Sequence, residues 1–196
     1  MASTKIGIDI GSTAAKAAVI TDGKITHTIC IPTGYSGIDA AERLRTELES
    51  QGVDFENANI VATGYGRVSV PYATKTVTEI TCHAKGAAHL FQPTGTVIEI
   101  GGQDTKVIHL SNGSVANFTM NDKCSAGTGK FLEVMATRLG LTLPEMEQLA
   151  STGSETHISS MCTVFAESEV ISLIGSGEPK QNIAWGVIAS VVSRVS

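Results

Sequence analysis

The residues of this chain best suited to chemistry occur twice, in the same order and ninety positions apart. Residues 8–25 read IDIGSTAAKAAVITDGKI, and residues 98–115 read IEIGGQDTKVIHLSNGSV. Each copy ends an apolar stretch with a carboxylate, Asp9 or Glu99, and continues with a turn of small residues and a lysine. Glycine lets backbone amides approach phosphate oxygens, and a carboxylate can bind Mg²⁺ through water. The repeat therefore predicts two phosphate-binding hairpins, and we expect a nucleotide to fit between them.

A third segment with a possible role in anion binding is NDKCSAGTGK at residues 121–130. It places Gly127 and Gly129 where a helix should begin, and the free amides and dipole of a helix start attract anions. The alternative is a helix start with flexible glycines and no ligand. Neither this segment nor the two hairpins has the spacing GxxxxGK[ST] or GxGxxG, so neither a P-loop nor a dinucleotide-binding fingerprint is predicted.

Two of the four cysteines, Cys124 and Cys162, share a local pattern in which the cysteine precedes small or hydroxyl residues and then a helix. Helix N-termini favour the thiolate form, which binds metals. Two thiolates are too few for an iron–sulfur cluster, but a symmetric dimer would supply two more across its axis. The alternative is that these are reduced thiols packed as small apolar side chains. For Cys30 and Cys82 we expect such packing in the core.

Composition restricts the class of protein. The chain has 196 residues with 42% hydrophobic residues, enough for a real core, and a net charge of −5. It has no run of Lys and Arg and no apolar stretch long enough to span a membrane, so we expect neither nucleic acid nor membrane as a partner. The start MASTKIGIDIG enters a strand directly and predicts no signal peptide, which makes the cytoplasm the expected location.

Hydrophobic periodicity and turn signals predict an alternation of strands and helices. The expected strands are 5–10, 15–21, 24–31, 60–63, 96–100, 105–111 and 114–119. The expected helices are 37–51, 78–91, 127–139, a short helix after Pro144, 164–175 and 183–195. We predict a first lobe at 1–93 and a second at 94–196. The second has no counterparts of the later strands of the first, so we expect it to be incomplete.

Five segments together resemble one family: IGIDIGSTAAK, ATGYGR, IEIGGQDTK, NDKCSAGTGKFLE and MCTVFAESEV. They are similar to the activators of 2-hydroxyacyl-CoA dehydratases, within the BadF/BadG/BcrA/BcrD ATPase family of benzoyl-CoA reductase and related proteins. The resemblance implies an α/β actin-like ATPase fold, of the superfamily of actin, sugar kinases and Hsp70, with a duplicated ribonuclease H-like motif. The two cysteine segments distinguish this branch from sugar kinases and chaperones.

The resemblance also implies an activity. Such an activator is a homodimer that holds one [4Fe–4S] cluster between its subunits, and here the ligands would be Cys124 and Cys162 of each. ATP with Mg²⁺ is bound and hydrolysed to ADP, which drives a low-potential electron into a dehydratase or reductase component. A ferredoxin or flavodoxin is the expected electron donor.

Carried over by motif, the resemblance assigns residues to the nucleotide site. The catalytic positions linked to Mg²⁺ and water fall on Asp9, Glu99 and Asp104, and Glu99 departs from the more usual aspartate. The nucleotide-binding positions fall on Gly11, Ser12, Thr13, Ala14, Ala15, Lys16, Gly101, Gly102, Gln103, Gly127, Thr128 and Gly129. Family members continue past residue 196 with further strands and a glycine-rich adenosine-binding segment, so the chain is either a fragment or a naturally shorter form.

Two other functions use the same nucleotide-binding lobes. A sugar or small-molecule kinase would transfer phosphate to an acceptor and would contain no iron. A non-catalytic ATP-sensing regulator would hydrolyse ATP slowly, and a partner would recognise its conformation. Iron content distinguishes the electron-transfer activator from both.

Overall fold

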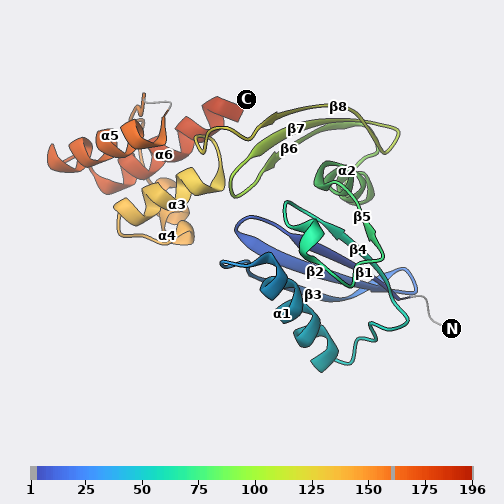
Figure 1. Ribbon diagram of the computed structural model, residues 1–196. Coiled ribbons are helices and arrows are strands. Elements are labelled where there is room, and N and C mark those ends of the chain that lie inside the picture. Colours follow the sequence, from blue (N-terminus) through green and yellow to red (C-terminus); the bar gives the residue numbers. More distant parts are fainter. Residues whose placement is uncertain (1–3, 160–161, 196) are drawn as a thin grey trace. The chain divides into compact units, whose positions relative to one another are not determined.

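The protein is described by a computed structural model that covers residues 4–159 and 162–195 (Figure 1). Met161, the first residue of the MCTVFAESEV segment, lies outside the described residues. Packing divides the chain into two compact units. The first comprises Met1–Gly95 and His109–Asn117, and the second comprises Thr96–Ile108 and Phe118–Ser196.

The first unit is built on a five-stranded sheet in the order β3-β2-β1-β4-β5. Strands β1 (Thr4–Ile10), β2 (Ala14–Thr21) and β3 (Lys24–Pro32) are antiparallel, as their sequence pattern predicts. Strand β4 (Asn59–Thr63) pairs with β1 in parallel, and the short β5 (Lys75–Thr76) extends the edge. The central position of β1 places Asp9 beside Lys16 of β2 on one side and Thr63 of β4 on the other.

One face of this sheet is covered by α1 (Gly37–Ser50) (Figure 1). Ile6, Ile8 and Ile10 alternate along β1 and are buried, because successive side chains of a strand point to opposite faces. They form one core with Leu44 and Leu48 of α1. The intervening residues of β1, Asp9 among them, point to the opposite face and stay accessible for binding.

The first unit also contains α2 (Glu79–Leu90) and the single-turn helix η1 (Arg67–Ser69). The sequence predicts α2, but η1 and β5 are too short to give a periodic signal. Cys30 is exposed on β3 and Cys82 is half-buried on α2, which contradicts the expectation that both pack in the core. Alternation explains the error, since Cys30 lies out of phase with the half-buried Ile29 and Ile31 that pack against the core.

The second unit joins a three-stranded sheet, in the order β6-β7-β8, to four helices. The strands are β6 (Gly95–Ile100), β7 (Thr105–Ser111) and β8 (Ser114–Asn121), although the turn of the β7–β8 hairpin with its flanking residues, His109–Asn117, belongs to the first unit. The helices are α3 (Gly129–Arg138), α4 (Leu143–Ala150), α5 (Thr163–Gly175) and α6 (Lys180–Val195). They bury a core of their own, centred on Phe131, Met135, Val170, Ile183 and Val187.

The ninety-residue repeat is confirmed in the backbone. Asp22 and Gly23 between β2 and β3 have φ of 50° and 80°, and Asn112 and Gly113 between β7 and β8 have φ of 50° and 73°. Two successive residues with positive φ are the signature of a two-residue hairpin turn that matches the twist of the strands. The sequence predicts four strands in the first lobe and three in the second, and the described residues give five and three, because the short β5 joins the first sheet.

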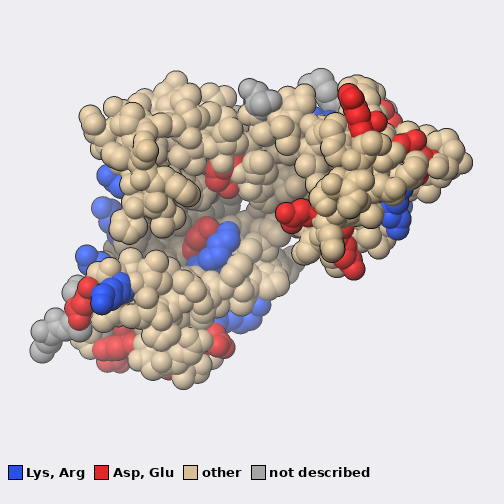
Figure 2. All heavy atoms as spheres, turned by 180° about the vertical axis from the view of Figure 1, so that it is seen from behind, with Lys and Arg blue, Asp and Glu red and all other residues tan. Residues whose placement is uncertain are grey.

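Charged side chains of both signs lie on the surface of the described residues. On the face shown in Figure 2, Lys and Arg side chains of the described residues lie scattered among Asp and Glu rather than in one basic patch. None of the helices in the described ranges combines the length and the apolar character needed to cross a membrane.

Candidate functional site

The first hairpin places a carboxylate and a lysine side by side. Asp9 ends β1 and Lys16 lies opposite it on β2, with Lys16 Nζ 3.1 Å from Asp9 Oδ2. Their side chains are 26% and 47% exposed, so both can reach a ligand. The turn between them is closed by the Gly11 amide, which donates to the Ala14 carbonyl at 3.1 Å, and the Thr33 hydroxyl donates to the Gly11 carbonyl at 2.7 Å. These bonds hold the turn in one conformation.

The ATGYGR segment at residues 62–67, which begins at the end of β4, also fixes the position of Asp9. Gly64 has a φ of 86°, and a Cβ at this position would collide with the Asp9 carboxylate and the Ile10 carbonyl. The Gly66 amide donates to that carbonyl at 2.8 Å. Only glycine at position 64 allows this close approach, so the segment is more than a surface turn.

The second hairpin repeats the arrangement with more charge. Lys106 is almost fully buried, with 2% of its side chain exposed, and its Nζ lies 3.0 Å from Glu99 Oε2 and 2.7 Å from Asp104 Oδ2. The Asp104 contact is an ion pair without the angles of a hydrogen bond, and its Oδ2 accepts none from the described residues. The Gly101 amide donates to the Asp104 carbonyl at 2.8 Å, as Gly11 does to Ala14. Glu99 and Asp104 thus share one buried cation.

Each hairpin turn presents backbone amides that phosphate oxygens could use. The amides of Ser12 and Thr13 in the first turn, and of Gly102 and Gln103 in the second, make no hydrogen bond to other described residues. A turn with successive unused amides forms a concave site for anions. The predicted phosphate-binding residues therefore fall into two turns, one in each unit.

The start of α3 differs from the sequence-based expectation. The Gly129 amide donates to the Gly101 carbonyl at 2.8 Å, and the Lys130 amide donates to the Gly102 carbonyl at 2.9 Å. These amides are therefore not free for an anion, and that part of the prediction is wrong. The reason is the φ of 83° at Gly127, which brings the helix start back against the hairpin, where the Thr105 hydroxyl donates to the Gly127 carbonyl at 2.7 Å.

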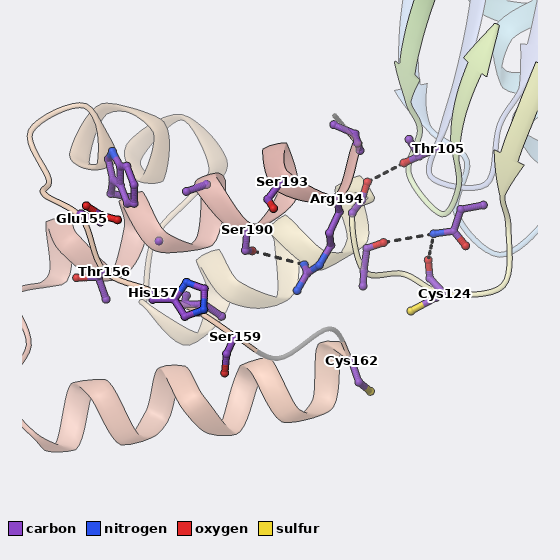
Figure 3. Close-up of a pocket in the computed structure, with 18 of the residues that line it drawn as sticks. Thr105, Cys124, Glu155, Thr156, His157, Ser159, Cys162, Ser190, Ser193 and Arg194 are labelled. Atoms are coloured by element: carbon purple, nitrogen blue, oxygen red, sulfur yellow. Dashed lines mark hydrogen bonds between the residues drawn. The ribbon is translucent and has the colours of Figure 1, made fainter.

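Cys124 and Cys162 lie on the same cavity of the second unit (Figure 3). The cavity has a volume of about 1020 Å³, and both cysteines are exposed. Cys124 lies in the loop after β8, and Cys162 is the residue before α5 begins. Figure 3 shows them at the same end of the cavity, away from Glu155 and Thr156. The structure therefore brings together two thiols that are 38 residues apart in sequence.

The residues after the two cysteines are bonded to each other. Ser125 Oγ and Thr163 Oγ1 are 2.9 Å apart, a hydrogen bond in which either hydroxyl can donate. The Asn121 side-chain amide donates to the Cys124 carbonyl at 3.2 Å and to the Ala126 carbonyl at 3.4 Å (Figure 3). The loop that carries Cys124 is thus held in place before any ligand binds.

The side chains that could bind a metal show which kind of metal site the chain can form. In residues 4–159 and 162–195 no group of three or more His, Cys, Asp or Glu side chains could hold a metal ion by itself. Two exposed thiols on one cavity are half of the four thiolates that an iron–sulfur cluster takes. The described residues could therefore supply two of the four thiolate ligands of such a cluster.

Comparison with known proteins decides the family. Residues 6–196 match the profile of the BadF/BadG/BcrA/BcrD ATPase family. This chain is a member of that family. It is 46% identical over 196 residues to the (R)-2-hydroxyglutaryl-CoA dehydratase activating ATPase of Acidaminococcus fermentans, with 97% of this chain and 75% of that protein covered. It is 48% identical over 195 residues to the activator of lactoyl-CoA dehydratase of Anaerotignum propionicum, with 96% and 74% covered.

Solved structures confirm the fold of this family member. The activator of the 2-hydroxyisocaproyl-CoA dehydratase from Clostridium difficile, determined with bound ADPNP, superposes with a TM-score of 0.92 at 41% identity. The match covers 100% of this chain and 74% of that one. The chain has the α/β actin-like ATPase fold of these activators, with the ribonuclease H-like motif in two copies.

Sequence reasoning did not single out three features of the site. Lys106 was visible as the repeat of Lys16, but its burial between two carboxylates was not. The role of Gly64 depends on the pairing of β4 with β1, which no local pattern specifies. A hydroxyl residue follows each of the two cysteines, which could have suggested a hydrogen bond between Ser125 and Thr163. Nothing in the sequence, however, shows that these two residues lie side by side.

Proposed function

We propose that this chain is the ATP-dependent activator of a 2-hydroxyacyl-CoA dehydratase or of a related reductase. The observation that carries the proposal is the placement of Cys124 and Cys162, two exposed thiols on one cavity. Such a pair is what each chain must contribute if two chains share one cluster. The relatives named as dehydratase activators support this class of partner.

In the proposed protein, two copies of the chain bind one [4Fe–4S] cluster. Cys124 and Cys162 of each copy are its ligands, and the Ser125–Thr163 and Asn121 hydrogen bonds hold their segments ready. When bound, the cluster supplies one-electron transfer at low potential. Exposure of both thiols leaves room for the second copy.

The two hairpins bind ATP with Mg²⁺. The unused amides of the turns bind phosphate oxygens, and Lys16 adds a positive charge. Asp9 and Glu99, whose side chains are 26% and 22% exposed, hold the waters of Mg²⁺ and orient the attacking water. Asp104 is buried against Lys106, so we assign it a positioning role, in which it fixes the second turn. The relative determined with ADPNP supports a nucleotide triphosphate as ligand.

The proposed reaction couples the transfer of one electron to the hydrolysis of ATP. A reduced ferredoxin or flavodoxin loses one electron, the dehydratase or reductase component gains one, and this protein returns to its starting state. ATP and water give ADP and phosphate, and binding or release of phosphate charge at the hairpin changes the position of α3. The hydrogen bonds from Gly129 and Lys130 to the second turn are the physical basis for that change.

Iron content tests the proposal. Protein purified without oxygen should be brown and contain about four irons and about four sulfides per two chains. Cys124→Ser should lack both, whereas Cys30→Ser should retain them, because Cys30 is an exposed cysteine of the first unit that does not line the cavity. A Cys124→Ser protein with undiminished iron and sulfide would refute the assignment. Protein that hydrolyses ATP but never contains iron would favour the kinase or ATP-sensing function.

A further inference from the structure

The hydrogen bond between Ser125 and Thr163 joins the two cysteine segments. Each hydroxyl residue directly follows its cysteine, and the two oxygens are 2.9 Å apart in a partly buried position. A partly buried hydrogen bond between short side chains restrains both backbones, because neither side chain has a long flexible stem. Any displacement of one segment therefore acts on the other.

The Cys124 side of this bond is tied to the second hairpin. The Thr128 hydroxyl donates to the Ser125 carbonyl at 2.6 Å, one residue before α3 begins. The next residue, Gly129, donates its amide to the Gly101 carbonyl of the phosphate-binding turn at 2.8 Å. A movement of that turn thus reaches Cys124 through short backbone links.

The Cys162 side is tied to α5 instead. The Cys162 carbonyl accepts the Ala166 amide at 2.9 Å in the first turn of the helix. The Glu169 carboxylate, further along α5, accepts the Ser159 amide at 3.1 Å and so ties Ser159 to the same helix. The Arg138–Glu167 ion pair also joins α3 to α5, from the last residue of α3. The Ser125–Thr163 bond lies next to the two cysteines.

We infer that Ser125 and Thr163 are positioning residues that make Cys162 follow Cys124 when nucleotide moves the second hairpin. The inference rests on the proposed function, because it needs a nucleotide at that hairpin and a shared role for the two thiols. The bond restrains the residue after one cysteine against the residue after the other, so the two thiols are displaced together. Nucleotide binding then changes the position of both thiols together, so the spacing of the ligands within one chain is kept while their exposure changes.

The iron-free chain allows a direct test, because alkylation rates report each thiol separately. Iodoacetamide labelling of Cys124 and Cys162, followed by peptide mass spectrometry, is compared with and without ADPNP and Mg²⁺. In the unmodified chain ADPNP should change both rates by about fivefold or more, the lower end of ordinary coupling between sites. In Ser125→Ala and in Thr163→Val the change at Cys124 should remain, and the change at Cys162 should be lost.

Two control variants distinguish loss of the Ser125–Thr163 hydrogen bond from a general destabilisation of the second unit. Thr163→Ser keeps a hydroxyl and should retain the response at Cys162. Arg138→Met removes the Arg138–Glu167 ion pair between α3 and α5 and should also retain it. A Ser125→Ala chain in which ADPNP still changes both rates overturns the inference.

Failure of the proposed function gives a different result. Calorimetric titration of the unmodified chain with ADPNP and Mg²⁺ measures nucleotide binding directly. Absence of binding refutes the nucleotide part of the proposed function, and the inference with it. Binding that changes the rate at Cys124 but not at Cys162 in the unmodified chain overturns the inference alone.

Discussion

At the scale of single residues, Lys106 decides the charge balance of the second hairpin. It is buried between Glu99 and Asp104, whereas its counterpart Lys16 is 47% exposed beside Asp9. The two lysines have the same place in the repeat, but Lys106 is buried and contacts two carboxylates, whereas Lys16 is exposed and contacts one. Removing one partner of a buried ion pair costs far more than removing one at the surface, since the remaining charge has lost its solvation.

We expect Lys106→Met to lower the free energy of unfolding of the second unit by about 3–5 kcal/mol. Lys16→Met, the matched control, should lower that of the first unit by less than about 1 kcal/mol. Urea unfolding followed by Trp185 fluorescence reports the second unit, because the only tryptophan of the chain lies on α6. Circular dichroism follows the chain as a whole. Equal losses in the two variants would contradict the burial of Lys106.

Gly64 is a second residue whose replacement should have a large effect, because it sets the position of Asp9. Gly64→Ala should weaken ADPNP binding by about tenfold or more, because its methyl group would displace the carboxylate, and a misplaced catalytic group loses much of its effect. Gly52→Ala is the matched control, since Gly52 has a φ of 85° and nothing within 4 Å of an added Cβ. Both variants carry the same backbone strain, about 1–2 kcal/mol. Calorimetric titration should show a loss of affinity in Gly64→Ala alone, and equal affinities would show that Asp9 is not displaced.

At the scale of elements, the start of α4 depends on a charged side chain. Thr142 and Glu145 form a reciprocal capping box, in which the Thr142 amide and hydroxyl donate to Glu145 Oε2 at 2.7 Å and 2.8 Å. These two hydrogen bonds, the backbone one first, lower the pKa of Glu145 from its ordinary value of 4.5. The ionised carboxylate is thus favoured in the folded state.

The contribution of this carboxylate to the free energy of unfolding should therefore decrease as the pH falls. A lowered folded-state pKa contributes stability that is complete above about pH 4.5 and is lost as the pH falls through the folded-state value. Glu145→Gln should be less stable than the unmodified chain at neutral pH, and the difference should shrink steadily below pH 4.5. Glu147→Gln, on the same helix but without a bond to Thr142, should show no such trend in urea unfolding. A constant difference at all pH values would mean that the charge of Glu145 is not involved.

Elements were largely predictable from the sequence, but the contacts between them were not. The repeat, the turn pairs Asp22-Gly23 and Asn112-Gly113 and the amphipathic helices are local patterns, and they predict the observed strands and helices within a few residues. Both cysteine positions before helices were also predictable. The burial of Lys106 and the return of α3 onto the hairpin depend on contacts between distant segments. Periodicity contains no information on such contacts, so the amides at the start of α3 were wrongly expected to be free.

At the scale of the whole molecule, the number of thiols in one chain bears on its assembly. Each chain places Cys124 and Cys162 on one cavity, and the described residues contain no group of three or more metal-binding side chains. If the cluster joins two chains, it contributes binding energy to the dimer but none to the separate chains. The oligomeric state should then depend on iron.

Removal of iron should therefore shift the protein from dimer to monomer. Analytical ultracentrifugation without oxygen, before and after treatment with an iron chelator, measures this shift, and dilution should favour the monomer further once the cluster is lost. Cys124→Ser should be monomeric without chelator, because it lacks one of the ligands, whereas Cys30→Ser should remain a dimer until iron is removed. Dimers of the same stability in iron-free Cys124→Ser protein would show that the chains associate without the cluster, and the ligand role of Cys124 would then rest on iron content alone.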